Sequence, residues 1–341
     1  MKKTIVLLII VLMLAPVAGL FARGASEDAT PKHAFIFKNT GNPYGDKQMQ
    51  GFADGIEEQG FEAITRAPDQ PTAEAQIQII ELLIAQKVAS ISITGNDFDA
   101  LEPVLNRAMD AGIVVLSADS AVNPNSRMTH INQADSEMIG RTLIQAAYDM
   151  ADGAGDIAIL SATSQASNQN LWIEWMQKEL AENPTKYANL KLVRVAYGDD
   201  LRDKSVSETE GLLQSFPNLE VIIAPTTVGI AAAGRVVTDR GLIGDIKVTG
   251  LGLPSEMAEY IENGACPYMF LWNPIDVGFL TAYAATAAVA GDLTGAAGET
   301  FSAGRLGEFT VVPASDGGTE VLLGAPFKFD PGNIAEWKTV Y

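Results

Sequence analysis

The stretch FEAITRAPDQPTAEAQIQIIELLIAQKVASISIT, residues 61–94, contains the pattern that decides the fold. It begins and ends with short runs typical of β-strands, 61–65 and 90–94. Between them, residues 72–86 start at a polar threonine and repeat apolar side chains at spacings of three and four, which predicts an amphipathic helix. The stripe that we expect to be core comprises Ile77, Ile80, Leu83 and Ile84. A helix between two strands predicts a βαβ unit with parallel strands.

The same alternation continues along the chain and forms two series of strands. We expect the first series at 34–38, 61–65, 90–94 and 114–118, and the second at 157–160, 192–196, 221–224 and 247–251. Two such series predict an α/β protein with two doubly wound parallel-sheet lobes, joined by short crossing strands that act as hinges. We expect one lobe to comprise 31–133 and about 275–300, and the other 134–272 and about 305–341.

Composition indicates a folded protein of more than one domain. The chain has 341 residues, of which 47% are apolar and 19% are charged, and one hydrophobic core seldom supports such a length. The formal net charge of -19, without a block of lysine or arginine, would repel phosphate backbones. We therefore expect no nucleic acid partner.

The first 24 residues read as a secretory signal peptide. Lys2 and Lys3 precede an apolar run at 5–20, and Ala22 and Gly24 provide the small residues of a cleavage site. No second long apolar run follows, so we expect an exported, periplasmic chain that does not insert into a membrane. Cys266 lies far from the signal, so we do not expect a lipoprotein. It is also the single cysteine, so we expect no internal disulfide.

Polar residues follow several of the expected strands, where ligands bind in open parallel sheets. Carboxylates, amides and lysine can bond hydroxyl groups, and an aromatic face can cover C–H groups, so this set suits a small sugar. The candidate ligand-binding residues are Lys38, Asn39, Asp119, Asn168, Gln169, Pro225, Thr227, Trp272 and Asn273.

Some neighbouring residues are interpreted differently. Asn96, Asp97 and Thr226 are as typical of helix caps as of ligand contacts. Trp172 and Trp175 lie in a helical pattern and are expected to be packing groups, which leaves Trp272 as the tryptophan placed for a cleft.

The catalytic inventory favours a binding protein over an enzyme. His33 and His130 are the only histidines, Cys266 is alone, and no HExxH, GxSxG or Walker-type motif is present. We expect no catalytic residue, no metal ligand and no cofactor. A sugar-acting enzyme remains the alternative from another class, because 42 acidic residues make chance carboxylate pairs inevitable.

Several stretches resemble the rhamnose-binding proteins of bacterial ABC transporters, and the resemblance spans nearly the whole chain after the signal. They are INQAD at 131–135, SAT at 161–163, SNQN at 167–170, YGDD at 197–200, PTTVGI at 225–230, GLGLPSEM at 250–257, LWNPID at 271–276 and GRLGE at 304–308.

This resemblance implies a type I periplasmic binding protein fold with three crossing strands. It also implies L-rhamnose or a related deoxysugar as ligand, an ABC transporter permease as partner, and a monomer. Transcription regulators of the LacI type share the fold, but here a signal peptide stands where their DNA-binding head would be.

Receptors for autoinducer-2 are close relatives in this resemblance and supply the alternative ligand. Lys38, Asp119, Gln169 and Pro225 match the ligand-binding pattern of those receptors. Asn168 and Thr227 depart from it, since the receptors carry aspartate and alanine there. An amide donates where a carboxylate only accepts, so both departures favour the sugar.

Overall fold

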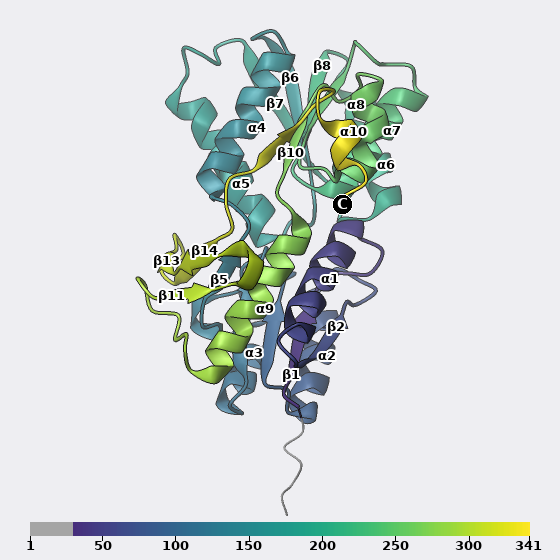
Figure 1. Ribbon diagram of the computed structural model, residues 1–341. Coiled ribbons are helices and arrows are strands. Elements are labelled where there is room, and N and C mark those ends of the chain that lie inside the picture. The colour runs from purple at the N-terminus through teal and green to yellow at the C-terminus, as the bar shows by residue number, and fades with distance from the viewer. Residues whose placement is uncertain (1–29) are drawn as a thin grey trace, which may run out of the picture. The chain divides into compact units, whose positions relative to one another are not determined.

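The computed structural model describes residues 30–341 (Figure 1). The expected signal peptide, 1–24, therefore lies outside the described residues. Pro31–Tyr341 cluster into one unit by their contacts. Within the described part of the chain, no helix combines the length and the apolar character needed to cross a bilayer.

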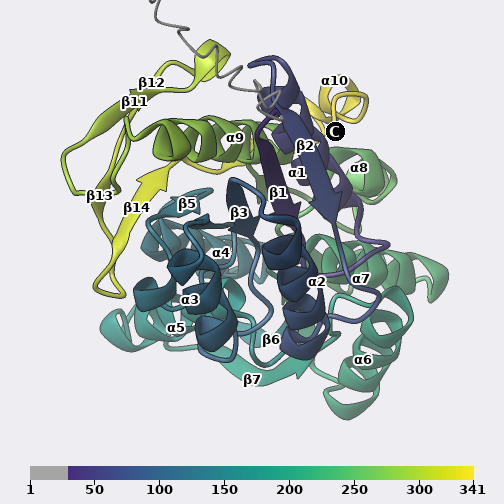
Figure 2. The same ribbon diagram turned by 90° about the horizontal axis from the view of Figure 1, so that it is seen from below.

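The first lobe is built on a sheet of seven strands in the order β13-β14-β5-β4-β3-β1-β2. All neighbouring strands pair in parallel except β13 and β14. Helices α1 and α9 cover one face and α2 and α3 the other, as Figure 2 shows. The elements are β1 (Lys32–Ile36), α1 (Pro43–Glu57), β2 (Glu62–Arg66), α2 (Ala73–Gln86), β3 (Ser90–Ile93), α3 (Glu102–Asp110), β4 (Val114–Ala118), η1 (Pro124–Ser126), β5 (His130–Asn132), α9 (Pro274–Ala290), β13 (Val312–Pro313) and β14 (Thr319–Leu322).

The second lobe is built on a parallel sheet of four strands in the order β7-β6-β8-β9. Two short antiparallel pairs, β10-β15 and β11-β12, complete the strands of the described chain. The elements are α4 (Ser136–Met150), β6 (Gly155–Ser161), α5 (Ser167–Glu182), β7 (Leu190–Tyr197), α6 (Arg202–Ser215), β8 (Leu219–Ala224), α7 (Thr227–Asp239), β9 (Lys247–Gly250), α8 (Pro254–Glu262), β10 (Met269–Leu271), β15 (Phe327–Phe329) and α10 (Ile334–Trp337). Between α9 and β14 the chain forms β11 (Thr300–Ser302), η2 (Gly304–Leu306) and β12 (Glu308–Thr310), which belong to the first lobe, where β11 contacts α9 and β12 contacts β14.

The predicted fold class is confirmed. Each of the eight expected strands overlaps an observed one, and α2 begins after the capping residue Thr72 and ends at Gln86 as expected. Ile80 and Leu83 of the predicted stripe are buried, and Ile77 and Ile84 pack against their cluster at partial burial. The stripe is therefore core, as the sequence indicates.

The chain crosses between the two lobes at three places. These lie between β5 and α4, between β10 and α9, and between β14 and β15. Figure 1 shows the third crossing as the yellow segment that leaves β14. Short crossings of this kind are where a two-lobed protein bends.

The third crossing comes later in the chain than we expect from the sequence. Residues of about 305–341 are predicted in the second lobe, but β14 pairs in parallel with β5 of the first, with Val321 opposite Ile131. The physical reason is that β5 would otherwise present an unpaired edge, which β14 covers. Elsewhere the expected lobe boundaries stay predictions.

Close packing of α1 against α9 fixes one side of the future site, because Tyr44 belongs to α1 and Trp272 stands just before α9. Glycines permit this approach. A Cβ on Gly51 would overlap the carbonyl oxygen of Ile275, and one on Gly278 would overlap that of Gln48. Any side chain at these positions forces the two helices apart.

We therefore expect Gly51→Ala to lower the free energy of unfolding by about 1–3 kcal/mol, the usual cost of overpacking. Gly211→Ala is the matched control, because Gly211 is exposed in α6 and its added Cβ would meet no atom within 4 Å. Higher helix propensity should make that variant more stable by up to about 1 kcal/mol. Urea unfolding at an unchanged m-value would measure both, and equal effects of the two substitutions would contradict the packing argument.

Candidate functional site

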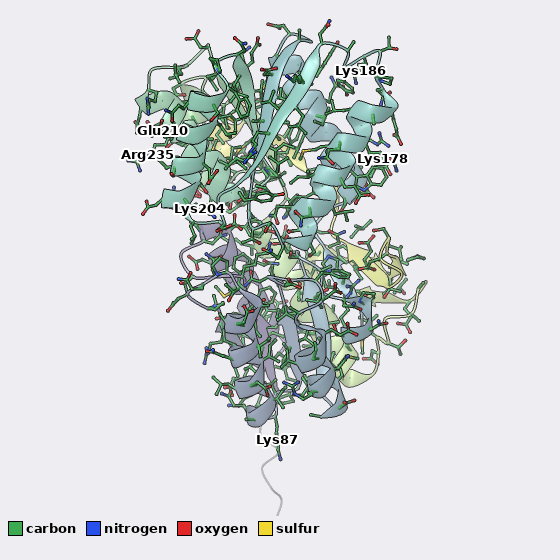
Figure 3. The ribbon with its side chains drawn as sticks, turned by 180° about the vertical axis from the view of Figure 1, so that it is seen from behind. Lys87, Lys178, Lys186, Lys204, Glu210 and Arg235 are labelled. Atoms are coloured by element: carbon green, nitrogen blue, oxygen red, sulfur yellow. The ribbon has the colours of Figure 1, made fainter. Side chains whose placement is uncertain are left out.

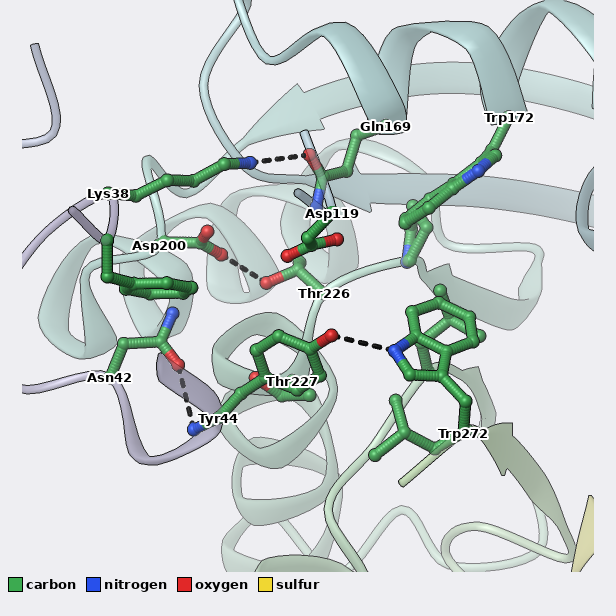
Figure 4. A pocket seen from close by; sticks show the side chains of 14 residues that line it. Lys38, Asn42, Tyr44, Asp119, Gln169, Trp172, Asp200, Thr226, Thr227 and Trp272 are labelled. Carbon is green, nitrogen blue, oxygen red and sulfur yellow. Dashed lines mark hydrogen bonds between the residues drawn. The ribbon is translucent and has the colours of Figure 1, made fainter. Parts of the chain in front are cut away.

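A small cavity lies where strands of both sheets end, which is where ligands bind in open parallel sheets. Figure 4 shows its polar and aromatic side chains. The lining residues are Phe37, Lys38, Asn42, Tyr44, Asp119, Gln169, Trp172, Asp200, Pro225, Thr226, Thr227, Leu251, Leu271 and Trp272.

Lys38 enters the cavity just after β1 and is 5% exposed. Its Nζ donates to Asn168 Oδ1 and Gln169 Oε1, both at 3.2 Å, in the first turn of α5. Burial lowers the pKa of Lys38, while the negative charges of Asp119 and Asp200 raise it. The lysine is thus held by amide oxygens of the other lobe and faces two carboxyl groups.

Asp119 follows β4 and is 6% exposed. Its Oδ1 accepts a hydrogen bond of 3.0 Å from Asn168 Nδ2. Burial raises its pKa to about 6, although Lys38 and the hydrogen bond from Asn168 act in the opposite direction. Its φ of 62° lies in the left-handed region, which side chains other than glycine adopt at a cost and which often marks functional positions.

Asp200 supplies a second buried carboxyl group, from the turn after β7. The Thr226 hydroxyl, just after β8, donates to Asp200 Oδ1 (Figure 4). Burial raises the pKa of Asp200, while Lys38 and the bond from Thr226 lower it. Its φ of 54° is left-handed as well, so both aspartates of the cavity have a backbone conformation that is uncommon for residues other than glycine.

Aromatic side chains form the apolar wall of the cavity. The indole Nε1 of Trp272 donates to Tyr44 Oη at 2.7 Å, and the Trp272 ring lies edge-on to that of Trp172 at 5.8 Å between centroids. Phe37 follows β1, and Leu251 and Leu271 extend the wall. Because the hydrogen bond occupies the indole N–H, Trp272 presents mainly apolar surface.

Six of the nine predicted site residues line the cavity: Lys38, Asp119, Gln169, Pro225, Thr227 and Trp272. Asn168 does not line it but bonds two members that do, Lys38 and Asp119. Asn39 and Asn273 lie outside the lining. The Asn39 amide donates to the Thr40 carbonyl. Asn273 caps α9 by accepting from Ile275 N.

The structure also corrects the interpretation of Trp172, which is not only a packing group, since it lines the cavity from α5. Trp175, three residues later, is half-buried beside Gly140 of α4, as expected of a packing group. Lys178 Nζ, labelled in Figure 3, lies 3.8 Å from the centroid of its ring. Of the other ambiguous residues, Asn96 bonds the Lys38 carbonyl and Asp97 caps the turn before α3.

Sequence reasoning missed Asp200, Asn42 and Tyr44 as lining residues, whereas Thr226, interpreted as either a helix cap or a ligand contact, lines the cavity and makes no side-chain cap bond. Asn42 and Tyr44 belong to the cap and first turn of α1, which follows the strand that delivers Lys38. Their position shortly after a strand is the pattern from which they could be predicted as site residues. Asp200 stands within the quoted YGDD stretch, but its preceding neighbour Asp199 is also an aspartate, and sequence alone does not say which of them turns inward.

The histidines and the cysteine take no part in the cavity. His33 and His130 bond Ser90 and Ser117 within the first sheet, each at 2.8 Å, and burial lowers their pKa values to about 4 and about 3. Cys266 is buried, which raises the pKa of its thiol. Within residues 30–341, no group of three or more histidine, cysteine, aspartate or glutamate side chains is placed to hold a metal ion.

Comparison with known proteins gives consistent matches. A family model described as periplasmic binding protein domain matches residues 33–293. The chain is 48% identical to an ABC transporter solute-binding protein from Clostridium phytofermentas with bound L-rhamnose, with a TM-score of 0.90 and coverage of 92% of this chain and 99% of that one.

Two further matches are more distant. LsrB from Clostridium saccharobutylicum in complex with AI-2 has a TM-score of 0.83, but at 22% identity, over 90% of this chain and 99% of that one, the likeness concerns the fold. The D-ribose/D-allose-binding protein of Pseudomonas aeruginosa is 24% identical over 200 residues, which are 56% of this chain. The chain spans 60% of the length of that curated relative.

Asp119→Asn tests the electrostatics of the cavity without any ligand. The folded protein binds a proton at Asp119 more tightly than the unfolded chain does, because its pKa is raised from 3.8 to about 6. The wild type should therefore lose stability relative to the variant as the pH rises from about 4 to about 6. Melting temperatures across pH 4–8 measure this trend, with Asp54→Asn at an exposed position of α1 as control. A difference that stays constant with pH would contradict the assignment.

Proposed function

This chain belongs to the family of periplasmic binding protein domains, and from that premise we propose that it is the substrate-binding component of an ABC importer for L-rhamnose or a related deoxysugar. The observation that carries the proposal is a cavity with charged groups on one side and aromatic rings on the other. Sugar hydroxyls suit Lys38, Asp119 and Asp200, whereas ring C–H groups and the methyl of a deoxysugar suit the tryptophan wall.

Uptake in this proposal depends on closure of the two lobes. Lys38 and Asp119 come from the first lobe, and Gln169, Asp200 and Thr227 from the second. A ligand that bonds both groups favours the closed arrangement and shifts the population toward it, with the three crossings as hinges. The permease then recognises the closed form. We propose that the chain acts in the periplasm as an exported monomer and has no catalytic role.

Autoinducer-2 is the second candidate ligand. Lys38, Asp119, Gln169 and Pro225, which match the pattern of its receptors, all line the cavity. Asn168 favours the sugar over autoinducer-2 as the ligand, because its amide accepts from Lys38 and donates to Asp119 at the same time. An ionised aspartate at this position would have no proton to donate to Asp119.

Calorimetric titration tests the ligand. We expect ligand-stripped protein to bind L-rhamnose at one site with a dissociation constant at or below about 1 μM, equivalent to about -8 kcal/mol. D-ribose, D-allose and L-fucose serve as comparison sugars, and autoinducer-2 as the competing ligand. Tight autoinducer-2 binding without rhamnose binding would replace the proposed ligand, and millimolar affinity for every sugar would contradict an uptake function.

Asn168→Asp tests why an amide stands beside Asp119. Two carboxyl groups at hydrogen-bond distance cannot both ionise readily, so one must hold a proton or repel the other. We expect the variant to bind L-rhamnose at least about tenfold more weakly at pH 7 and to recover part of the loss near pH 5. Asn170→Asp, on the same helix but outside the cavity, is the matched control. Equal affinity of the variant and wild type at both pH values would remove Asn168 from the site.

A further inference from the structure

One carboxylate oxygen of Asp200 faces the cavity without a hydrogen bond from the described residues. Its side chain is 7% exposed, and Oδ1 accepts the Thr226 hydroxyl. Among the described residues, no donor bonds its second oxygen, Oδ2. Because Asp200 lines the cavity, this oxygen is open to a hydrogen-bond donor that enters it.

Asp119 presents the same arrangement from the other lobe. Asn168 occupies its Oδ1, and no described residue donates to its Oδ2. Lys38 is the only ammonium among the lining residues, and amide oxygens of Asn168 and Gln169 already accept two of its protons. The two open carboxylate oxygens therefore come from opposite lobes and suit a neutral ligand that donates through several hydroxyls.

We propose that Asp200 is a specificity-determining residue of this sugar site, which accepts a ligand hydroxyl at Oδ2 opposite the one that Asp119 accepts. This inference rests on the proposed function and deepens it. The ligand class is a monosaccharide with hydroxyls toward both carboxylates and an apolar edge toward Trp172 and Trp272. Thr226 is a positioning residue, because its hydroxyl fixes Oδ1 and leaves Oδ2 directed at the ligand.

Backbone geometry supports the assignment. Asp199 and Asp200 both have left-handed φ values, 55° and 54°, and the two side chains diverge. Asp199 bonds Lys204 on the exposed side of α6, where Figure 3 shows the lysine, whereas Asp200 turns into the cavity (Figure 4). The strained turn thus serves to direct one carboxylate inward.

These neighbours provide a matched pair of variants. Asparagine tolerates the left-handed region about as well as aspartate, so Asp200→Asn and Asp199→Asn change charge with little change of backbone. We expect Asp200→Asn to weaken L-rhamnose binding by about 10- to 100-fold, the loss typical of a hydrogen bond to a charged group. Asp199→Asn should stay within about twofold of the wild type. Asp200→Gly, which also suits a positive φ, provides a second variant if the asparagine does not fold.

Monodeoxy analogues separate direct contact from a structural effect. L-Rhamnose, its 2-, 3- and 4-deoxy forms, and 1,5-anhydro-L-rhamnitol, which lacks the anomeric hydroxyl, are titrated into the wild type and Asp200→Asn. We expect one analogue, which lacks the hydroxyl bonded by Asp200, to bind both proteins equally, while the others lose the full factor. The same loss for every analogue, or no loss for L-rhamnose, would overturn the role of Asp200 and leave the proposed function standing. A wild type that binds none of these sugars would overturn the proposed function and the inference with it.

Discussion

One ammonium and two carboxyl groups buried in a single cavity are the constraint on which the rest of this structure depends. Burial lowers the pKa of Lys38 and raises those of Asp119 and Asp200, and so disfavours the charged form of each group. The lysine and the two carboxylates favour one another's charged forms, whereas Asp200 disfavours the charge of Asp119. The fold brings them together by placing each just after a parallel strand. It also holds the two aspartates in left-handed backbone, which costs stability that the remaining core must offset.

Sequence predicted the framework of this arrangement and part of the site. Alternating strands and helices located both sheets, and the ends of β1 and β4 located Lys38 and Asp119, because strand ends converge in parallel sheets. Direction of side chains was harder to predict. Lys38 and Asn39 are adjacent, as are Asp199 and Asp200, and in each pair only one side chain lines the cavity.

Long-range pairing explains the other differences between sequence and structure. The position of β14 beside β5 joins residues almost 190 positions apart, through an edge that no local pattern marks. Trp172 belongs to a helix whose apolar period is the same for a packing face as for a cavity wall. The sequence pattern shows that a face is buried, but it does not show whether protein or ligand covers it.

Asn168 connects these observations, because one side chain satisfies groups of opposite charge from the first lobe. Its oxygen accepts from Lys38 and from the Ser120 hydroxyl, and its nitrogen donates to Asp119 at 3.0 Å. A carboxylate could accept these hydrogen bonds but could not donate to Asp119, and a hydrophobic residue could do neither. Since the amide joins the second lobe to both charges, the closure that we propose would also compensate these charges, and the proposed ligand would supply hydroxyl donors to the remaining carboxylate oxygens.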